Sequence, residues 1–242
     1  MNTLTRSDPK TESKEIRNEI NRLSIGFGNY PVSNEHLYLD NFANEEKVKE
    51  FDALVLICGG ATESLRLVHL FGEKAKHIYI VDKDADSIGR FKLLLRIMEE
   101  NPAYSKADFE YYTKVTKADK SNSMFYRSVI DEMRVSGDIA EKIKYIQEDI
   151  NDAISELTDY SEKRRYFFYL SNILGSGWSE KLLDTISSKI VNNENVVKGS
   201  EVLLVGNNDK EFMILEKKST QSIKKRVFSN SPYEKFLRNQ SE

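Results

Sequence analysis

A repeated alternation of short apolar runs with helical patterns constrains the fold of this chain more than any other feature. Residues 53–58 form a continuous apolar run that ends at Gly59 and Gly60, as expected for a strand buried on both faces, and residues 62–71 have a helical pattern. Residues 77–81 form a second apolar run, which ends at Asp82. Strands that alternate with helices pair in parallel through right-handed crossovers. The sequence therefore predicts an α/β fold with a doubly wound, mostly parallel sheet.

Later segments extend the same pattern. After the second strand, apolar residues at helical spacing run to about Pro102. The connection that follows, residues 103–141, is about 40 residues long, where a short loop is usual, and we expect it to be a helical insert. Further on we expect strands over residues 143–146, 166–170 and 202–205, a helix over 182–190, and two last strands, 212–215 and 226–228, that pair antiparallel at a sheet edge.

The segment before the first strand is expected to be one helix and a loop. Residues 1–12 are mostly polar and are expected to be a frayed terminus, whereas Ile16, Ile20 and Leu23 fall at helical spacing. The chain therefore divides into residues 1–52, an N-terminal helix and cap segment, and residues 53–242, the main domain with its insert at about 103–141.

Composition narrows the range of partners. Lys and Arg number 36 against 39 Asp and Glu, so the net charge of -3 gives no general attraction to nucleic acid or to an anionic membrane. The chain shows one cysteine, no signal-peptide pattern and no run of about 18 apolar residues. We therefore expect a cytoplasmic protein with a small-molecule substrate, and a homodimer stays open. No metal site is expected, because the three histidines lack ligand spacing.

The residues that follow the first two strands are the strongest chemical signal. Gly59 and Gly60 let a ligand approach the backbone, and the next helix offers free N–H groups to an acidic ligand group. Asp82 lies 22 residues after Gly60, where a carboxylate can accept hydrogen bonds from the hydroxyls of an adenosine ribose. The order strand, turn, helix, strand and acid is typical of nucleotide-cofactor enzymes. The alternatives are a simple tight turn at the glycines and a helix cap at Asp82.

With these residues the chain resembles the class I S-adenosylmethionine-dependent methyltransferases, over roughly residues 53–215. The resemblance implies a Rossmann-like fold and S-adenosylmethionine as cofactor. It also implies a set of cofactor-binding positions: the glycine turn at Gly59, Gly60 and Ala61, the ribose acid at Asp82 with Asp84 second, and Asp149 and Ile150 beside the adenine.

The residues after the fourth strand carry the expectations about catalysis. The stretch Leu170-Ser171-Asn172-Ile173 lacks the Asn-Pro-Pro-aromatic motif of amino-group methyltransferases, which argues against methylation of nucleobases. It is similar to a stretch in enzymes that transfer the 3-amino-3-carboxypropyl arm of the cofactor. The resemblance thus implies catalytic positions at Tyr169, Ser171 and Asn172, with Ser171 also near the cofactor.

Several alternatives stay open. The first alternative concerns the carbon attacked, which belongs either to the methyl group or to the aminocarboxypropyl arm of the cofactor. The arm could be attacked by an acceptor or by the cofactor's own amine, and either attack on the arm releases methylthioadenosine. A dinucleotide cofactor is less favoured, because three glycines in Gly-x-Gly-x-x-Gly register are absent. A non-catalytic cofactor-binding or scaffold protein is the alternative of a different class. Cys58 is interpreted as a buried strand end rather than a nucleophile.

Overall fold

The structure is a computed structural model, and it describes part of the chain. The described residues are 9–24, 50–58, 61–99, 108, 110–111, 114–115, 135–159, 162–171, 184–205, 212–219 and 222–228.

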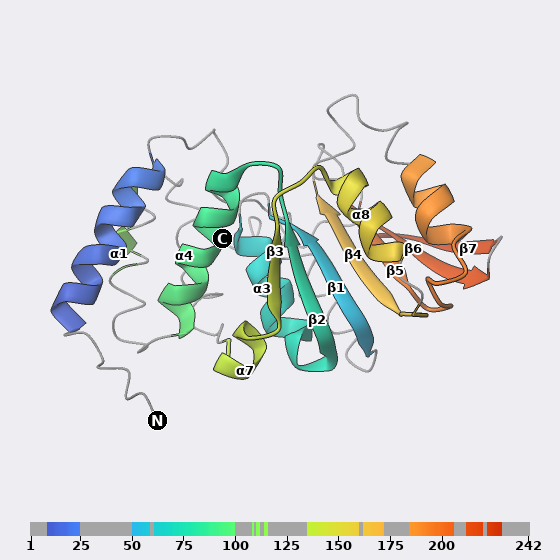
Figure 1. Cartoon of the computed structure of the whole chain (residues 1–242), viewed down its shortest axis with the longest axis horizontal. Coiled ribbons are helices and arrows are strands. Elements are labelled where there is room, and N and C mark those ends of the chain that lie inside the picture. Colours follow the sequence, from blue (N-terminus) through green and yellow to red (C-terminus); the bar gives the residue numbers. More distant parts are fainter. Residues whose placement is uncertain are drawn as a thin grey trace, which may run out of the picture.

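A seven-stranded sheet forms the centre of the protein (Figure 1). Its strand order is β3-β2-β1-β4-β5-β6-β7. The first five strands in this order pair in parallel, and β6 pairs antiparallel with both β5 and β7. The predicted doubly wound α/β fold with an antiparallel edge is therefore confirmed. The strands are β1 (Phe51–Ile57), β2 (Ala75–Val81), β3 (Ile143–Ile146), β4 (Tyr166–Ser171), β5 (Glu201–Val205), β6 (Phe212–Ser219) and β7 (Ser222–Phe228).

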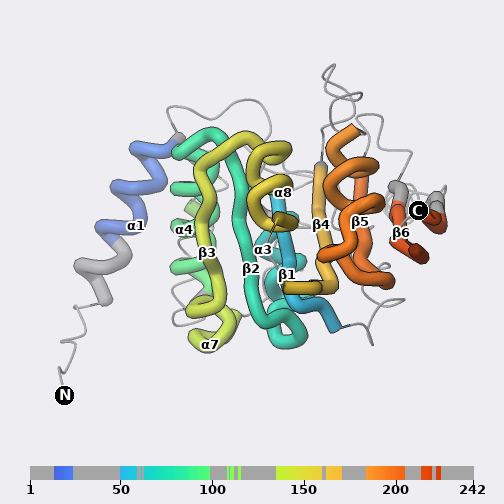
Figure 2. The backbone as a smooth tube through the Cα atoms, turned by 45° about the vertical axis from the view of Figure 1, so that its right-hand side comes forward, coloured from blue at the N-terminus to red at the C-terminus, as the bar shows by residue number. Residues whose placement is uncertain are grey.

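Helices cover both faces of this sheet. One face packs against α3 (Thr62–Phe71) and α4 (Ala85–Glu99), and the other against α8 (Ile150–Thr158) and the π-helix η2 (Ile186–Val191). The helix α1 (Pro9–Ser24) lies beside α4, as both views show (Figures 1 and 2). Two short helices complete the described elements, η1 (Gly72–Lys74) before β2 and α7 (Gly137–Ala140) before β3.

The continuous apolar runs of the central strands explain this layering. Successive residues of a strand point to opposite faces, so Leu54 and Leu56 join the core beneath α3 and α4, whereas Ala53 and Val55 join the core beneath α8 and η2. All four are fully buried. Each core removes apolar surface from water, and together they hold the sheet between its two helical layers.

The helix α1 belongs to the first of these cores. Ile16, Ile20 and Leu23 are buried there, at the spacing that predicted the helix. A Cβ atom on Gly89 of α4 would lie 3.3 Å from Leu23, so the last turn of α1 packs closely on the second turn of α4. The division of the chain at residue 52 stays a prediction.

Several elements differ from the sequence-based expectations, among them β2, β6 and β7, which are longer than expected. The helix α1 begins at Pro9, because proline suits the first turn of a helix, so residues 9–12 are not frayed. The first strand begins two residues earlier than expected, at Phe51. The helix α8 was not expected, although Asp149 caps it and Ile150, Ala153, Ile154 and Leu157 form its buried face. The helix before β5 is a π-helix rather than an α-helix.

The described part of the insert contacts α1. Arg17 Nε lies 3.2 Å from Asp108 Oδ1, and the hydroxyl of Tyr111 donates to Asn21 Oδ1 at 2.9 Å. Arg17 also lies over the ring of Tyr111. The helical face expected at Phe125, Val129, Ile130 and Met133 lies outside the described residues.

A buried lysine fixes the end of η2 against the sheet. Lys217 of β6 is 3% exposed, and its Nζ donates to the carbonyl oxygens of Ile190 at 3.1 Å and Asn193 at 2.5 Å. Burial lowers the pKa of Lys217. The last carbonyls of a helix have no partner within it, so this ammonium group supplies a buried donor to Ile190 O. At Asn193 O it adds to the Val196 N–H, which donates to the same oxygen at 3.3 Å.

Replacing this lysine should therefore destabilise the protein. We expect Lys217→Met to lower the free energy of unfolding in urea by about 2 kcal/mol, because the buried carbonyl of Ile190 loses this donor and that of Asn193 keeps only the Val196 N–H. The control is Lys218→Met, which removes only the partly exposed pair with Glu216 and should cost less than about 0.5 kcal/mol. Equal losses in the two variants would contradict this role of Lys217.

Candidate functional site

The carboxyl ends of the parallel strands lie together at one end of the sheet, at the top in Figure 1, and we call this end the carboxyl edge. Register places Ile57 of β1 beside Val81 of β2, and Val81 beside Ile146 of β3. The chain passes from β1 outward to β2 and β3 and then returns to β4 on the other side of β1. Strand order therefore reverses between β1 and β4, and a crevice at such a reversal is where open α/β sheets bind ligands.

The turn after β1 begins at this reversal. The Cys58 N–H donates to Val81 O at 2.9 Å, and the Ala61 N–H donates to Cys58 O at 2.7 Å, which closes a tight turn. The two glycines of this turn, Gly59 and Gly60, lie outside the described residues. Ala61 has φ 73° and ψ -33°, a conformation that favours glycine. The turn thus holds its last residue under backbone strain.

The helix α3 starts directly after this turn. No side chain in the described part of the chain caps its N-terminus, and the first-turn N–H groups of a helix suit an acidic ligand group. The hydroxyl of Ser64 donates to Ile57 O at 2.5 Å and ties the helix to the end of β1.

Two buried charges on α3 were not singled out from the sequence. Glu63 is 3% exposed and Arg66 6% exposed. Charged groups are rarely buried to this extent unless they are paired. The position of Glu63 directly after the glycine turn is the signal that could have indicated it.

The thiol of Cys58 is buried at the end of β1. It donates to Ser87 O of α4 at 2.9 Å. Burial raises the pKa of Cys58, and the nearby carboxylate of Asp82 raises it further. A protonated, buried thiol is not a nucleophile, which agrees with the interpretation of Cys58 as a strand end.

Two carboxylates follow β2, and they have different local roles. Asp84 caps α4, because its Oδ1 accepts from the Asp86 N–H at 3.1 Å. Asp82 is half-buried, and its Oδ1 accepts from the Asp84 N–H at 2.9 Å, which shapes the turn. The helix cap that the sequence left open for Asp82 is thus made by Asp84. Asp82 lies directly at the strand end, level with the turn after β1.

Asp149 and Ile150 follow β3. The Oδ1 of Asp149 accepts from the backbone N–H of Asn151 at 3.0 Å and from its side-chain Nδ2 at 2.8 Å, so Asp149 caps α8. Ile150 is 5% exposed and packs in the core beneath α8. Both lie at the same edge as Asp82, because β3 pairs with β2.

The structure describes two of the three residues that are expected to act in catalysis. Ser171 is the last residue of β4 and pairs with Val205 of β5. Tyr169 is 2% exposed and lies in the core beneath α3 and α4. Asn172 lies outside the described residues. The catalytic roles of these three residues stay predictions.

The strand ends thus bring several of the predicted positions together. Ala61, Asp82, Asp84, Asp149 and the backbone of Ser171 lie along one edge, at the ends of adjacent strands. Among the described residues no group of His, Cys, Asp and Glu could hold a metal ion. In the same part of the chain, no helix is long and apolar enough to cross a membrane.

Comparisons with known proteins find similar structures but no similar sequence. No protein-family model matches the chain. No curated protein sequence matches it either. Three similar solved structures are a NodS N-methyltransferase, a putative O-methyltransferase and a complex named DhpI-SAM-HEP.

The N-methyltransferase NodS from Bradyrhizobium japonicum WM9, in complex with S-adenosyl-l-homocysteine, is 8% identical with a TM-score of 0.37, covering 78% of this chain and 71% of that chain. The putative O-methyltransferase, from Klebsiella pneumoniae, is 7% identical with a TM-score of 0.40, covering 83% and 66%. The DhpI-SAM-HEP complex is 13% identical with a TM-score of 0.34, covering 98% and 90%.

The strain at Ala61 leads to a prediction about stability. Ala61→Gly should relieve about 1–2 kcal/mol of backbone strain, which stabilises the folded state. It also removes a buried methyl group and raises the entropy of the unfolded chain, and each of these effects destabilises the protein by less than about 1 kcal/mol. We therefore expect the free energy of unfolding to change by less than about 0.5 kcal/mol. The control is Ala153→Gly at a fully buried position inside α8, which should cost about 2 kcal/mol. A comparable loss in both variants would show that Ala61 is not strained.

Proposed function

We propose that this chain is an S-adenosylmethionine-dependent transferase that acts on a small molecule. The observation that carries the proposal is the order of the chemical groups along the carboxyl edge of the sheet. The N-terminus of α3, which no described side chain caps, follows β1, Asp82 follows β2, and Asp149 and Ile150 follow β3. The register keeps the three strand ends level. Complexes with S-adenosyl ligands are among the similar structures, which accords with this cofactor.

These groups fit the three parts of the cofactor. The first-turn N–H groups of α3 suit the α-carboxylate of its amino acid arm. The Asp82 carboxylate suits the two ribose hydroxyls, because a charged acceptor can take hydrogen bonds from both. Ile150 and the turn at Asp149 would lie beside the adenine. The order of the groups along the edge matches the order of the parts in the ligand.

The chemistry requires alignment rather than a nucleophilic side chain. When bound, S-adenosylmethionine supplies a sulfonium, which is an activated electrophile. The task of the protein is to hold an acceptor in line with the breaking carbon–sulfur bond and to exclude water. Cys58, buried and protonated, has no part in such a reaction.

Two reactions accord with this arrangement, and they differ in the carbon attacked. Attack of an amine on the methyl carbon sends the electron pair of the carbon–sulfur bond to sulfur and leaves S-adenosylhomocysteine. Attack on the first carbon of the aminocarboxypropyl arm leaves methylthioadenosine. In both, the amine then loses a proton. Ser171 ends β4, which lies on the opposite side of β1 from β2, and Asn172 is the next residue in the chain. We propose that these two residues hold the acceptor.

A binding experiment tests the proposed cofactor and its ribose contact. We expect S-adenosylhomocysteine to bind in calorimetry, NAD to give no comparable heat, and Asp82→Ala to weaken adenosyl binding 10- to 100-fold, about 1.5–3 kcal/mol. Because Asp82→Asn keeps an oxygen for the Asp84 N–H, it separates loss of charge from distortion of the turn. Asp86→Asn, at an exposed carboxylate four residues away, is the control and should leave affinity unchanged.

Binding of NAD without adenosyl binding would overturn the proposed cofactor. An unchanged dissociation constant in both Asp82 variants would indicate that Asp84, rather than Asp82, contacts the ribose.

A further prediction of the proposed function concerns the reaction products. Incubation with S-adenosylmethionine, first alone and then with small amines, should release S-adenosylhomocysteine or methylthioadenosine, which mass spectrometry separates. Asn172→Ala should slow the reaction more than tenfold and leave adenosyl binding nearly unchanged, because only the reacting end would lose alignment. Tight binding without any adenosyl product would support a non-catalytic cofactor-binding protein instead. The expectation that nucleic acid is not a partner stays a prediction, and so does a possible homodimer.

A further inference from the structure

We propose that Ser87 is a positioning residue that orients the turn at residues 82–84 for recognition of the cofactor ribose. The inference rests on the proposed function and extends it, since it names a residue that acts on the ligand only through Asp84 and Asp82. Ser87 lies in the first turn of α4 and is 6% exposed.

Three hydrogen bonds meet at Ser87. Its hydroxyl donates to Asp84 Oδ2 at 3.0 Å and accepts from Arg90 at 2.6 Å. Its carbonyl accepts from the Cys58 thiol at 2.9 Å. Arg90 also lies 3.7 Å from Asp84 Oδ2, with a side chain 11% exposed. One residue therefore connects the end of β1, the cap of α4 and a buried cation.

These bonds continue to Asp82. The two carboxylate oxygens of Asp84 are both engaged, Oδ1 by the Asp86 N–H and Oδ2 by Ser87, so the position of Asp84 is fixed. Its own N–H then donates to Asp82 Oδ1 at 2.9 Å. The conformation of the Asp82 side chain thus depends on a chain of bonds that starts at Arg90 and passes through Ser87.

Charge favours the same arrangement. Asp82 and Asp84 lie two residues apart in one turn, and repulsion between their carboxylates would open it. The guanidinium of Arg90 lies on the buried side of Asp84 and offsets this repulsion. A well-placed carboxylate discriminates ligands by their hydroxyl groups, because a ligand that lacks a hydroxyl leaves the acceptor without its partner.

The test compares two ligands on the same protein. S-adenosylhomocysteine and its 2′-deoxyribose analogue differ only in one ribose hydroxyl, and the ratio of their dissociation constants measures recognition of that group. The ratio does not change when part of a variant is unfolded, because both ligands meet the same folded fraction. We expect at least a tenfold preference for the ribose ligand in the unmodified protein.

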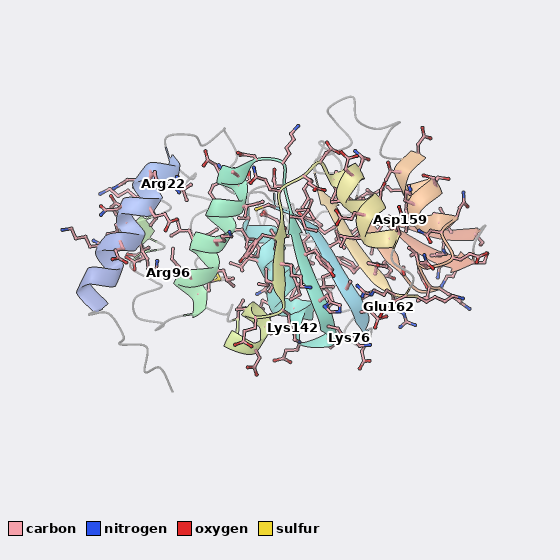
Figure 3. The ribbon with its side chains drawn as sticks, viewed as in Figure 1. Arg22, Lys76, Arg96, Lys142, Asp159 and Glu162 are labelled. Atoms are coloured by element: carbon pink, nitrogen blue, oxygen red, sulfur yellow. The ribbon has the colours of Figure 1, made fainter. Side chains whose placement is uncertain are left out.

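Variants of the network should reduce this preference. In Ser87→Ala we expect it to fall below threefold, with Ser87→Thr, which keeps a hydroxyl, restoring most of it. Arg90→Gln should act as Ser87→Ala does. The control is Arg96→Gln on the same helix, whose side chain lies toward α1, 3.8 Å from Glu15, and which should keep the full preference (Figure 3).

The outcomes separate the two proposals. A full ribose preference in Ser87→Ala and Arg90→Gln would overturn the positioning role and leave the proposed cofactor in place. Binding of both ligands without preference in the unmodified protein would overturn ribose recognition by this turn. If neither ligand binds the unmodified protein, the proposed function itself fails. If Ser87→Ala does not fold, Arg90→Gln gives the same comparison.

Discussion

The parallel pairing of β1 with β2 on one side and β4 on the other is the constraint on which the rest of the structure depends. These strands are buried on both faces, so each backbone group must find its partner in a neighbouring strand. The register that satisfies this requirement also brings the strand ends level. The edge at which Ala61 and Asp82 lie is thus a consequence of the core.

The turns at this edge are held by polar side chains rather than by apolar packing. Cys58 and Ser64 tie the end of β1 to α4 and α3, while Asp84 and Asp149 cap the helices that follow β2 and β3. Short side chains that bond their own backbone give a turn a defined shape at small cost in entropy. A ligand that contacts these turns would therefore meet groups already in place.

Lysines perform a similar structural task away from this edge. Lys142 donates to the carbonyls of Gly72 and Ala75, where η1 passes into β2, and Lys217 satisfies the end of η2. Figure 3 shows Lys142 with Lys76 and Glu162 at the lower end of the sheet, opposite the carboxyl edge. The two ends of the sheet thus differ: ion pairs and lysine-to-carbonyl bonds stabilise one, and the other carries the turns of the candidate site.

The sequence alone determined the order and type of most elements, because burial on both faces requires continuous apolar strands and one-sided burial requires helical spacing. It therefore predicted β1 to β5, α1, α3, α4 and the antiparallel edge. It did not predict α8, because Asp149 was interpreted as a ligand acid and a capping acid has the same local pattern. Only the tertiary structure decided the positive φ of Ala61, the burial of Glu63 and the meeting of Cys58, Asp84 and Arg90 at Ser87. The bonds from Cys58 join residues far apart in the chain, and backbone strain depends on how the turn is held, so neither leaves a mark in a single sequence.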